Sequence, residues 1–149
     1  TVRFVIRGFD MKILERSLNI AHQLHVNRLT QAHHIYSFIF DKNELVSIGQ
    51  NNMLTPNKKA YDIGLKYNIQ HFKDYSFLHS EMDSIGKLAN KRKITGKEHL
   101  VVIRLDYKFQ TKLAKPCKNC SEVIKAFGFK NIHYTDNNQW CSMSYKDIT

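Results

Sequence analysis

The chain has little cysteine and no long apolar run. Its three cysteines are too few for a disulfide framework, and two of them share one Cys-x-x-Cys. No apolar run approaches the roughly 20 residues that span a bilayer, and arginines interrupt the first residues, which excludes a signal peptide there. Two prolines and six glycines exclude a collagen-like chain. We therefore expect a cytoplasmic protein without a membrane segment.

Acidic residues are also scarce relative to basic ones. There are 13 Asp and Glu against 23 Lys and Arg, which gives a formal net charge of +10. This charge favours a phosphate-rich partner such as a nucleotide or a nucleic acid, although lysine also simply keeps small proteins soluble. The length of 149 residues suits a single domain over 1–149, with 1–9 as a candidate N-terminal extension.

Apolar spacing and turn residues predict an alternation of helices and strands. The predicted helices cover 10–27, 78–91 and 117–127. The predicted strands cover 33–40, 45–48, 100–105, 131–135 and 139–145. Asp10 is the expected N-cap of the first helix, Gly128 is expected to end the last, and 53–77 is interpreted as a long loop. Interleaved elements of this kind predict a sheet with helices on both faces.

Two short motifs stand at the starts of predicted helices. They are His79-Ser80-Glu81 and Pro116-Cys117-Lys118-Asn119-Cys120. Zinc binds imidazole nitrogen and thiolate sulfur, and a catalytic zinc site uses three protein ligands with one position left for water. Cysteines three positions apart on a first helical turn point the same way, and the helix N-terminus favours their thiolate form. The motifs therefore predict Zn²⁺ as the cofactor, with His79, Cys117 and Cys120 as its ligands.

Glu81 follows the proposed histidine ligand by two positions and need not bind the metal. A carboxylate placed there can lie beside the water molecule and move protons, which makes Glu81 the predicted catalytic residue. The combined pattern H-x-E and P-C-x-x-C is the signature of zinc-dependent nucleobase deaminases. It predicts hydrolytic deamination of cytosine to uracil, and adenine stays open because the zinc motif alone does not select the ring.

These motifs resemble the cytidine deaminase superfamily. The resemblance extends over roughly 35–145, and this run is similar to compact phage and viral deoxycytidylate or cytidine deaminases. It implies a three-layer α/β/α fold with a mixed five-stranded sheet, and the cytoplasm of a host cell if the protein is viral. The segment 47–51 is similar to a strand end at which an asparagine contacts the substrate sugar, which implies this role for Asn51. The turn at 136–138 suggests that the last two strands form an antiparallel hairpin, as in nucleoside-type members. The sequence departs from the family pattern in two ways. Ser80 stands where alanine is commoner, and the interval from Glu81 to Pro116 is longer than in many members, with 91–98 as the apparent excess.

Other residues close to the motifs are weaker candidates for substrate binding. Ser80, Lys115 and Pro116 flank the predicted catalytic and metal-binding residues and are included as substrate contacts. Lys115 either binds a 5′-phosphate or is simply solvated. The remaining histidines are expected to be structural or exposed to solvent: His22, His25, His33, His34, His71, His99 and His133.

Three functions remain open at the level of the sequence. The preferred one is deamination of a cytidine-type nucleotide such as dCMP. The second is deamination of cytosine in single-stranded DNA or RNA, which the net charge and the mixture of aromatic and basic residues over 58–75 favour. The third is a non-catalytic nucleic-acid-binding module with a structural zinc, for which His22 or His25 would supply a fourth ligand. A homo-oligomer is compatible with each of these.

Overall fold

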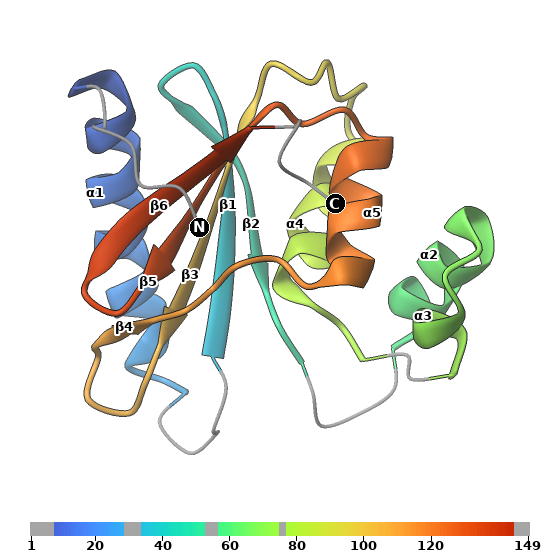
Figure 1. Ribbon diagram of the computed structural model, residues 1–149, viewed down its shortest axis with the longest axis horizontal. Coiled ribbons are helices and arrows are strands. Elements are labelled where there is room, and N and C mark those ends of the chain that lie inside the picture. The colour runs from blue at the N-terminus through green and yellow to red at the C-terminus, as the bar shows by residue number, and fades with distance from the viewer. Residues whose placement is uncertain (1–7, 29–33, 53–56, 75–76, 145–149) are drawn as a thin grey trace.

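A computed structural model describes residues 8–28, 34–52, 57–74 and 77–144 of the chain. Six strands and five helices follow one another along these residues (Figure 1). The helices are α1 Gly8–His25, α2 Lys58–Tyr67, α3 Gln70–Asp74, α4 Ser80–Ala89 and α5 Lys118–Ala126. The strands are β1 His34–Asp41, β2 Glu44–Gln50, β3 His99–Leu105, β4 Thr111–Lys112, β5 Asn131–Asp136 and β6 Gln139–Ser144. Residues 1–7 of the candidate N-terminal extension lie outside the described part.

The strands form one mixed sheet in the order β2-β1-β3-β5-β6. β1 pairs antiparallel with both β2 and β3, whereas β3 and β5 are parallel. β5 and β6 form the antiparallel hairpin that the turn at 136–138 predicted. The predicted five strands are thus confirmed, and the two-residue β4, which pairs with the end of β3, adds a sixth.

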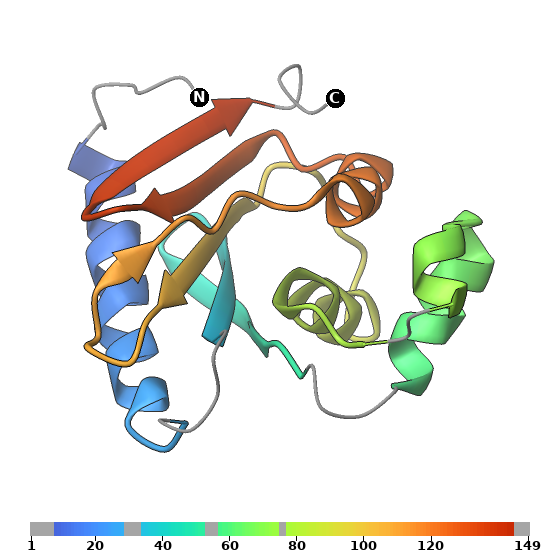
Figure 2. The ribbon, with the colours of Figure 1, turned by 60° about the horizontal axis from the view of Figure 1, so that its bottom comes forward.

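Helices cover both faces of this sheet, which confirms the predicted three-layer architecture. Figure 2 shows α1 on one side, α4 and α5 on the other, and the α2–α3 pair beyond α4. On the α1 side, Leu14 and Ala21 pack with Phe38 and Phe40 of β1. The other core lies under α4 and α5, and its buried residues include Ile85, Leu100, Val123, Ile124, Ile132 and Tyr134. The two predicted motifs lie at the starts of α4 and α5, the helices of this layer.

The interpretation of 53–77 as a long loop is wrong, because most of its described residues are helical. The side chain of Asn57 caps α2 by accepting the backbone N–H of Lys59 (2.8 Å), and Asn68 ends it in a left-handed conformation with φ 53°. A Cβ at Gly64 would lie 3.0 Å from the Cβ of Phe72, so the glycine permits α2 and α3 to pack closely. Phe72 is fully buried and therefore belongs to the core rather than to a base-stacking surface.

The helix ends agree with the sequence in one case and differ in another. Gly128 has φ 81° directly after α5, as expected for a glycine that ends a helix. α1 begins at Gly8, so Asp10 lies in its first turn and is not its N-cap. A carboxylate in the first turn still interacts favourably with the helix dipole. Within the described residues, no helix has both the length and the apolar character needed to cross a membrane.

The connection between α4 and β3 is organised around the buried carboxylate of Glu98. The backbone N–H groups of Thr95 and Gly96 donate to this carboxylate at 3.2 and 2.9 Å, and Nη1 of Arg92 lies 3.0 Å from Oε2. Burial alone would raise the pKa of Glu98, but the backbone N–H groups around its carboxylate and the Thr95 hydroxyl outweigh burial and lower it. Residues 91–98, which lengthen the interval between the two motifs, therefore form an ordered connection.

Replacing Glu98 with Gln is expected to lower the free energy of unfolding at neutral pH by about 2 kcal/mol, because charge-assisted hydrogen bonds are lost. The folded-state pKa of Glu98 lies below its unfolded-state value. Its contribution is therefore complete above the unfolded-state pKa and is lost as the pH falls through the folded-state pKa. Denaturant unfolding of both proteins between neutral and acidic pH measures this. A difference between them that stayed constant or grew on acidification would contradict the assignment.

Candidate metal and catalytic site

The predicted metal ligands meet where the N-termini of two adjacent helices converge. His79 is the N-cap of α4, and Cys117 is the N-cap of α5, with its Sγ accepting the backbone N–H of Cys120 (3.4 Å). Nδ1 of His79 lies 3.3 Å from Sγ of Cys120 and 3.8 Å from Sγ of Cys117. The three ligand atoms all lie within 4.8 Å of one another. The structure therefore brings together the three residues that the sequence proposed as ligands.

This donor set fits a zinc ion. With Zn–S near 2.3 Å and Zn–N near 2.0–2.1 Å, a tetrahedral site separates its sulfur and nitrogen ligands by about 3.6 Å. The two sulfur-to-nitrogen distances of 3.3 and 3.8 Å lie on either side of this value. Among the described residues, the group contains one imidazole and two thiols, which is the ligand number of a catalytic rather than a closed structural site.

The pKa values of the two thiols are shifted in opposite directions. The hydrogen bond from Cys120, together with that from His79, lowers the pKa of Cys117 to about 4. The hydrogen bond with Cys117, together with burial, raises the pKa of Cys120 well above the usual thiol value. Burial lowers the pKa of His79, but its hydrogen bond to Cys117 and the charge of Glu81 outweigh burial and raise it. One thiolate thus exists before metal binding, and a cation would displace the remaining protons.

Glu81 lies in the first turn of α4 and is only 5% exposed. Burial raises the pKa of its carboxyl group, while the hydrogen bond from Ser80 and the charge of His79 oppose the increase. The Ser80 hydroxyl donates to Oε1 of Glu81 at 2.7 Å. A carboxyl group with a raised pKa, held in one orientation, is suited to accept and return a proton near neutral pH.

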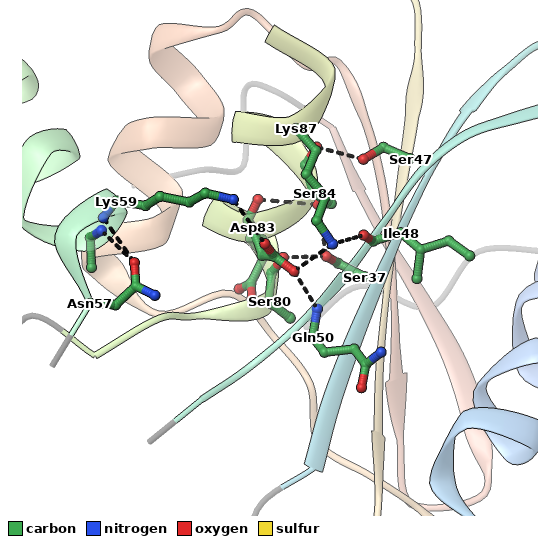
Figure 3. A network of polar contacts seen from close by, with 12 residues as sticks. Ser37, Ser47, Ile48, Gln50, Asn57, Lys59, Ser80, Asp83, Ser84 and Lys87 are labelled. Atoms are coloured by element: carbon green, nitrogen blue, oxygen red, sulfur yellow. Dashed lines mark hydrogen bonds and ion pairs between the residues drawn. The ribbon is translucent and has the colours of Figure 1, made fainter. Parts of the chain in front are cut away.

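Buried serine side chains fix α4 against the first two strands (Figure 3). The Ser37 hydroxyl of β1 donates to the carbonyl oxygen of Ser80 and lies 2.7 Å from the hydroxyl of Ser84. The Ser47 hydroxyl of β2 donates to the carbonyl oxygen of Ser84 at 2.7 Å. Because Ser80 directly precedes Glu81, these bonds position the first turn of α4, which carries Glu81, relative to the sheet.

Asp83 ties the same helix to the end of β2. Its Oδ2 accepts the backbone N–H of Gln50 at 3.0 Å and lies 3.0 Å from Nζ of Lys87 (Figure 3). Its Oδ1 lies 3.8 Å from Nζ of Lys59, which links the network to α2. Lys87 also donates to the carbonyl oxygen of Ile48 at 3.0 Å. The carboxylate thus joins three elements beside the first turn of α4.

Gly49 is the point of closest approach between β2 and α4. A Cβ there would lie 2.2 Å from the carbonyl oxygen of Ser80 and 2.5 Å from the backbone nitrogen of Ser84. Both contacts are with backbone, so no side-chain movement would relieve them. Glycine at this position allows α4 to lie directly on the strand, which brings Glu81 to the edge of the sheet.

A cavity of about 200 Å³ lies beside the three ligands. Asn51 lines it, with Oδ1 accepting the backbone N–H of Ile35 (3.0 Å) and an Nη2 hydrogen of Arg28 (3.2 Å). Arg28 also donates to the carbonyl oxygen of Asn51 at 2.7 Å. The lining residues are Ile35, Asn51, His79, Ser80, Glu81, Ala114, Lys115 and Cys117. Apolar walls and a few polar groups are typical of a small-molecule site.

Most residues proposed from the sequence lie at this one place. Asn51, Ser80, Glu81 and Lys115 line the cavity, and the exposed Lys115 stands at its rim. Pro116 is buried, does not line the cavity, and accepts the Ser121 hydroxyl through its carbonyl oxygen (3.4 Å), so its contact with substrate stays a prediction.

The sequence did not identify Arg28, Ile35 or Ala114 as part of this region. Arg28 follows α1 and reaches Asn51 across 23 positions, which no local spacing indicates. Ile35 and Ala114 are ordinary apolar residues whose place at the cavity depends on strand pairing. Such neighbours become visible only when the sheet is assembled.

The histidines proposed as a fourth ligand of a structural zinc do not approach the site. His22 and His25 belong to α1, which covers the opposite face of the sheet from α4 and α5 (Figure 2). Both ring nitrogens of His25 have other partners, the Tyr36 hydroxyl at 2.8 Å and the carbonyl oxygen of Asp106 at 2.8 Å. The proposal that either histidine completes a closed zinc site is therefore wrong.

Comparisons of the sequence with known proteins give no match, whereas comparison of the structure finds proteins of similar fold. No protein-family model matches the chain. No curated protein matches it. Among solved structures, the dCMP deaminase of the cyanophage S-TIM5 in its apo form is similar with a TM-score of 0.54 and 18% identity, over 88% of this chain and 86% of that one. The same enzyme in complex with dCMP and dUMP is similar with a TM-score of 0.54 and 17% identity, over 87% and 83%. At these identities the likeness establishes the fold, and the chain shares the three-layer fold of this cyanophage deaminase.

Proposed function

We propose that this protein is a zinc-dependent hydrolase that deaminates cytosine in a cytidine-type nucleotide such as dCMP. The observation that carries the proposal is the convergence of His79, Cys117 and Cys120 at two helix N-termini, beside a cavity lined by the buried Glu81. Three zinc-compatible ligands and an adjacent carboxylate that need not bind the metal are the parts that hydrolytic deamination requires.

Each residue of the site has a distinct role in the proposed reaction. Zinc held by the three ligands would supply a water molecule whose pKa is lowered toward about 7. Glu81 accepts a proton from the attacking water, whose oxygen forms a bond to C4, and delivers this proton to N3 of the cytosine ring. It then transfers the proton of the new C4 hydroxyl to the C4 amino group, so that the C4–N bond breaks, ammonia leaves and the C4 carbonyl of uracil forms. The Ser80 hydroxyl holds Glu81 by its 2.7 Å hydrogen bond during these transfers.

Two further residues support a nucleotide as the substrate. Asn51 lines the cavity, and its side chain is fixed by Ile35 and Arg28, so it can present a defined polar contact to a sugar. Lys115 is exposed at the rim, where a 5′-phosphate would meet a positive charge. The similar cyanophage enzyme was solved in complex with dCMP and dUMP, which supports the same substrate class here.

A side-by-side assay of dCMP, CMP, deoxycytidine and a cytosine-containing single-stranded oligonucleotide tests this proposal. We expect dCMP or CMP to be converted with the highest kcat/KM. Turnover only on the oligonucleotide, with a rate that falls steeply as salt increases, would replace the proposal with polynucleotide editing. Binding of the oligonucleotide without turnover of any substrate would favour the non-catalytic module.

The variant Lys115→Gln tests whether this lysine recognises the phosphate. An exposed ion pair contributes up to about 1 kcal/mol, so KM for dCMP should rise about fivefold while KM for deoxycytidine stays unchanged. Lys130→Gln removes an equally exposed lysine beyond the end of α5 and serves as the control. Equal effects of the two variants, or equal effects on both substrates, would rule out a phosphate contact.

A further inference from the structure

Among the described residues, a second group of side chains of the kinds that bind metal ions lies on the face of the sheet that α1 covers. Asp10 comes from the first turn of α1, His99 from the start of β3 and His133 from β5. The neighbours Leu100 and Ile132 belong to the core under α4 and α5, so strand alternation directs His99 and His133 toward the α1 side. The sheet therefore separates this group from His79, Cys117 and Cys120.

The ligand atoms of the three side chains converge on one point. Nδ1 of His99 lies 3.2 Å from Nε2 of His133 and 3.9 Å from Oδ1 of Asp10. The three atoms all lie within 4.8 Å of one another. Two imidazole nitrogens bound to one tetrahedral zinc ion at 2.0–2.1 Å are separated by about 3.3 Å. The observed distance between the two nitrogens thus already suits a shared ion, and Asp10 needs only a small movement.

The surroundings of the two histidines suit neutral ligands of fixed orientation. Nδ1 of His133 lies 2.6 Å from the Ser142 hydroxyl, an outer contact of the kind that orients a metal-binding imidazole. His133 is 5% exposed, and burial lowers its pKa to about 4. Burial also lowers the pKa of His99, although Asp10 opposes the change. Burial thus favours the uncharged form of both rings, which is the form that binds a metal ion.

We propose that Asp10, His99 and His133 form a second binding site for a divalent transition-metal ion, separate from the cysteine-containing site. Two imidazoles and one carboxylate suit zinc and neighbouring first-row ions. The site joins the N-terminal turn of α1 to β3 and β5, so a bound ion connects elements that the chain otherwise holds by packing. This proposal does not depend on the proposed deaminase activity.

The number of zinc ions bound per chain tests this proposal. Metal-free protein is equilibrated with Zn²⁺, passed through a desalting column and analysed for zinc and protein. We expect two ions per wild-type chain and one ion per chain for Asp10→Asn or His99→Gln. Glu15→Gln, which removes an exposed carboxylate from the same helix, is expected to keep two ions. Equal zinc content in the wild type and the His99→Gln variant would overturn the proposal and leave a hydrogen-bonded histidine pair.

A variant that lacks the two cysteines tests the second metal site separately from the proposed deaminase site. Cys117→Ser/Cys120→Ser is expected to retain one ion, to bind Co²⁺ without a sulfur-to-cobalt charge-transfer band, and to unfold at a higher temperature when Zn²⁺ is added. Addition of His99→Gln should abolish both the binding and the thermal shift. Ser142→Ala should weaken zinc binding ten- to a hundredfold by removing the outer contact. A cysteine double variant that binds no ion and shows no thermal shift would refute the second site, whatever the activity of the wild type.

Discussion

Replacing Glu81 with Gln is expected to lower kcat for deamination of a cytosine nucleotide by about 10²–10⁴-fold while leaving the bound zinc in place. Glutamine has nearly the same shape and can still accept the hydrogen bond from Ser80, but it cannot take up and return a proton. Glu81 is buried and its pKa is raised by that burial, so no external base would replace it efficiently. Steady-state kinetics and metal analysis of the same preparation measure both parts of this expectation.

Glu122→Gln provides a matched control for this experiment. Glu122 is an exposed residue of α5, so its replacement changes the net charge equally without reaching the cavity. It should deaminate as fast as the wild type. If Glu81→Gln retained more than a tenth of the wild-type kcat, another group would carry the protons. If it lost its zinc, Glu81 would be a ligand and the assignment of roles would be wrong.

Removal of the metal is expected to have the second large effect. Treatment with a chelator should reduce deamination to background, and added Zn²⁺ should restore it, because the attacking water would no longer be activated. Cys117→Ser should prevent this restoration, since Sγ of Cys117 is one of the three donors that lie around one point. Activity and zinc content, followed through removal and re-addition, measure the effect.

Cys141→Ala is the control for loss of a thiol. Cys141 lies in the core of the sheet and is 1% exposed, outside the group around His79. This variant should unfold more easily but should still bind zinc and deaminate. Full activity of chelator-treated protein, with zinc absent by elemental analysis, would exclude the proposed role of the metal.

The candidate metal-binding residues were predictable because their signal is local. Cys117 and Cys120 are three positions apart, a spacing that brings two side chains to the same side of a helix start, and His79 and Glu81 stand together at the start of another predicted helix. The two hairpins β1–β2 and β5–β6 were also predictable, since turn residues and apolar runs indicated them, whereas the order of the strands in the sheet was not. The helices α2 and α3 were missed because their mixture of basic and aromatic residues conceals a short apolar face, and only the caps Asn57 and Asn68 marked α2.

The remaining features depend on the assembled sheet. β4 consists of two residues, which is too short for any periodic signal. His99 and His133 are 34 positions apart and meet because β3 and β5 are parallel neighbours, so the expectation that each is merely structural could not include their pairing. Arg28, which follows α1, contacts Asn51, which follows β2, although 23 positions separate the two residues. Contacts of this kind follow from topology and not from spacing along the chain.

The most direct test of the account is conversion of dCMP in water enriched in oxygen-18. Hydrolysis at the proposed site should yield dUMP that carries one labelled oxygen at C4, with one ammonia released for each dUMP formed. The Glu81→Gln variant should yield neither product at a comparable rate. A zinc-loaded wild-type protein that forms no labelled uracil product from dCMP, CMP, deoxycytidine or a cytosine-containing oligonucleotide would contradict the proposed deaminase function.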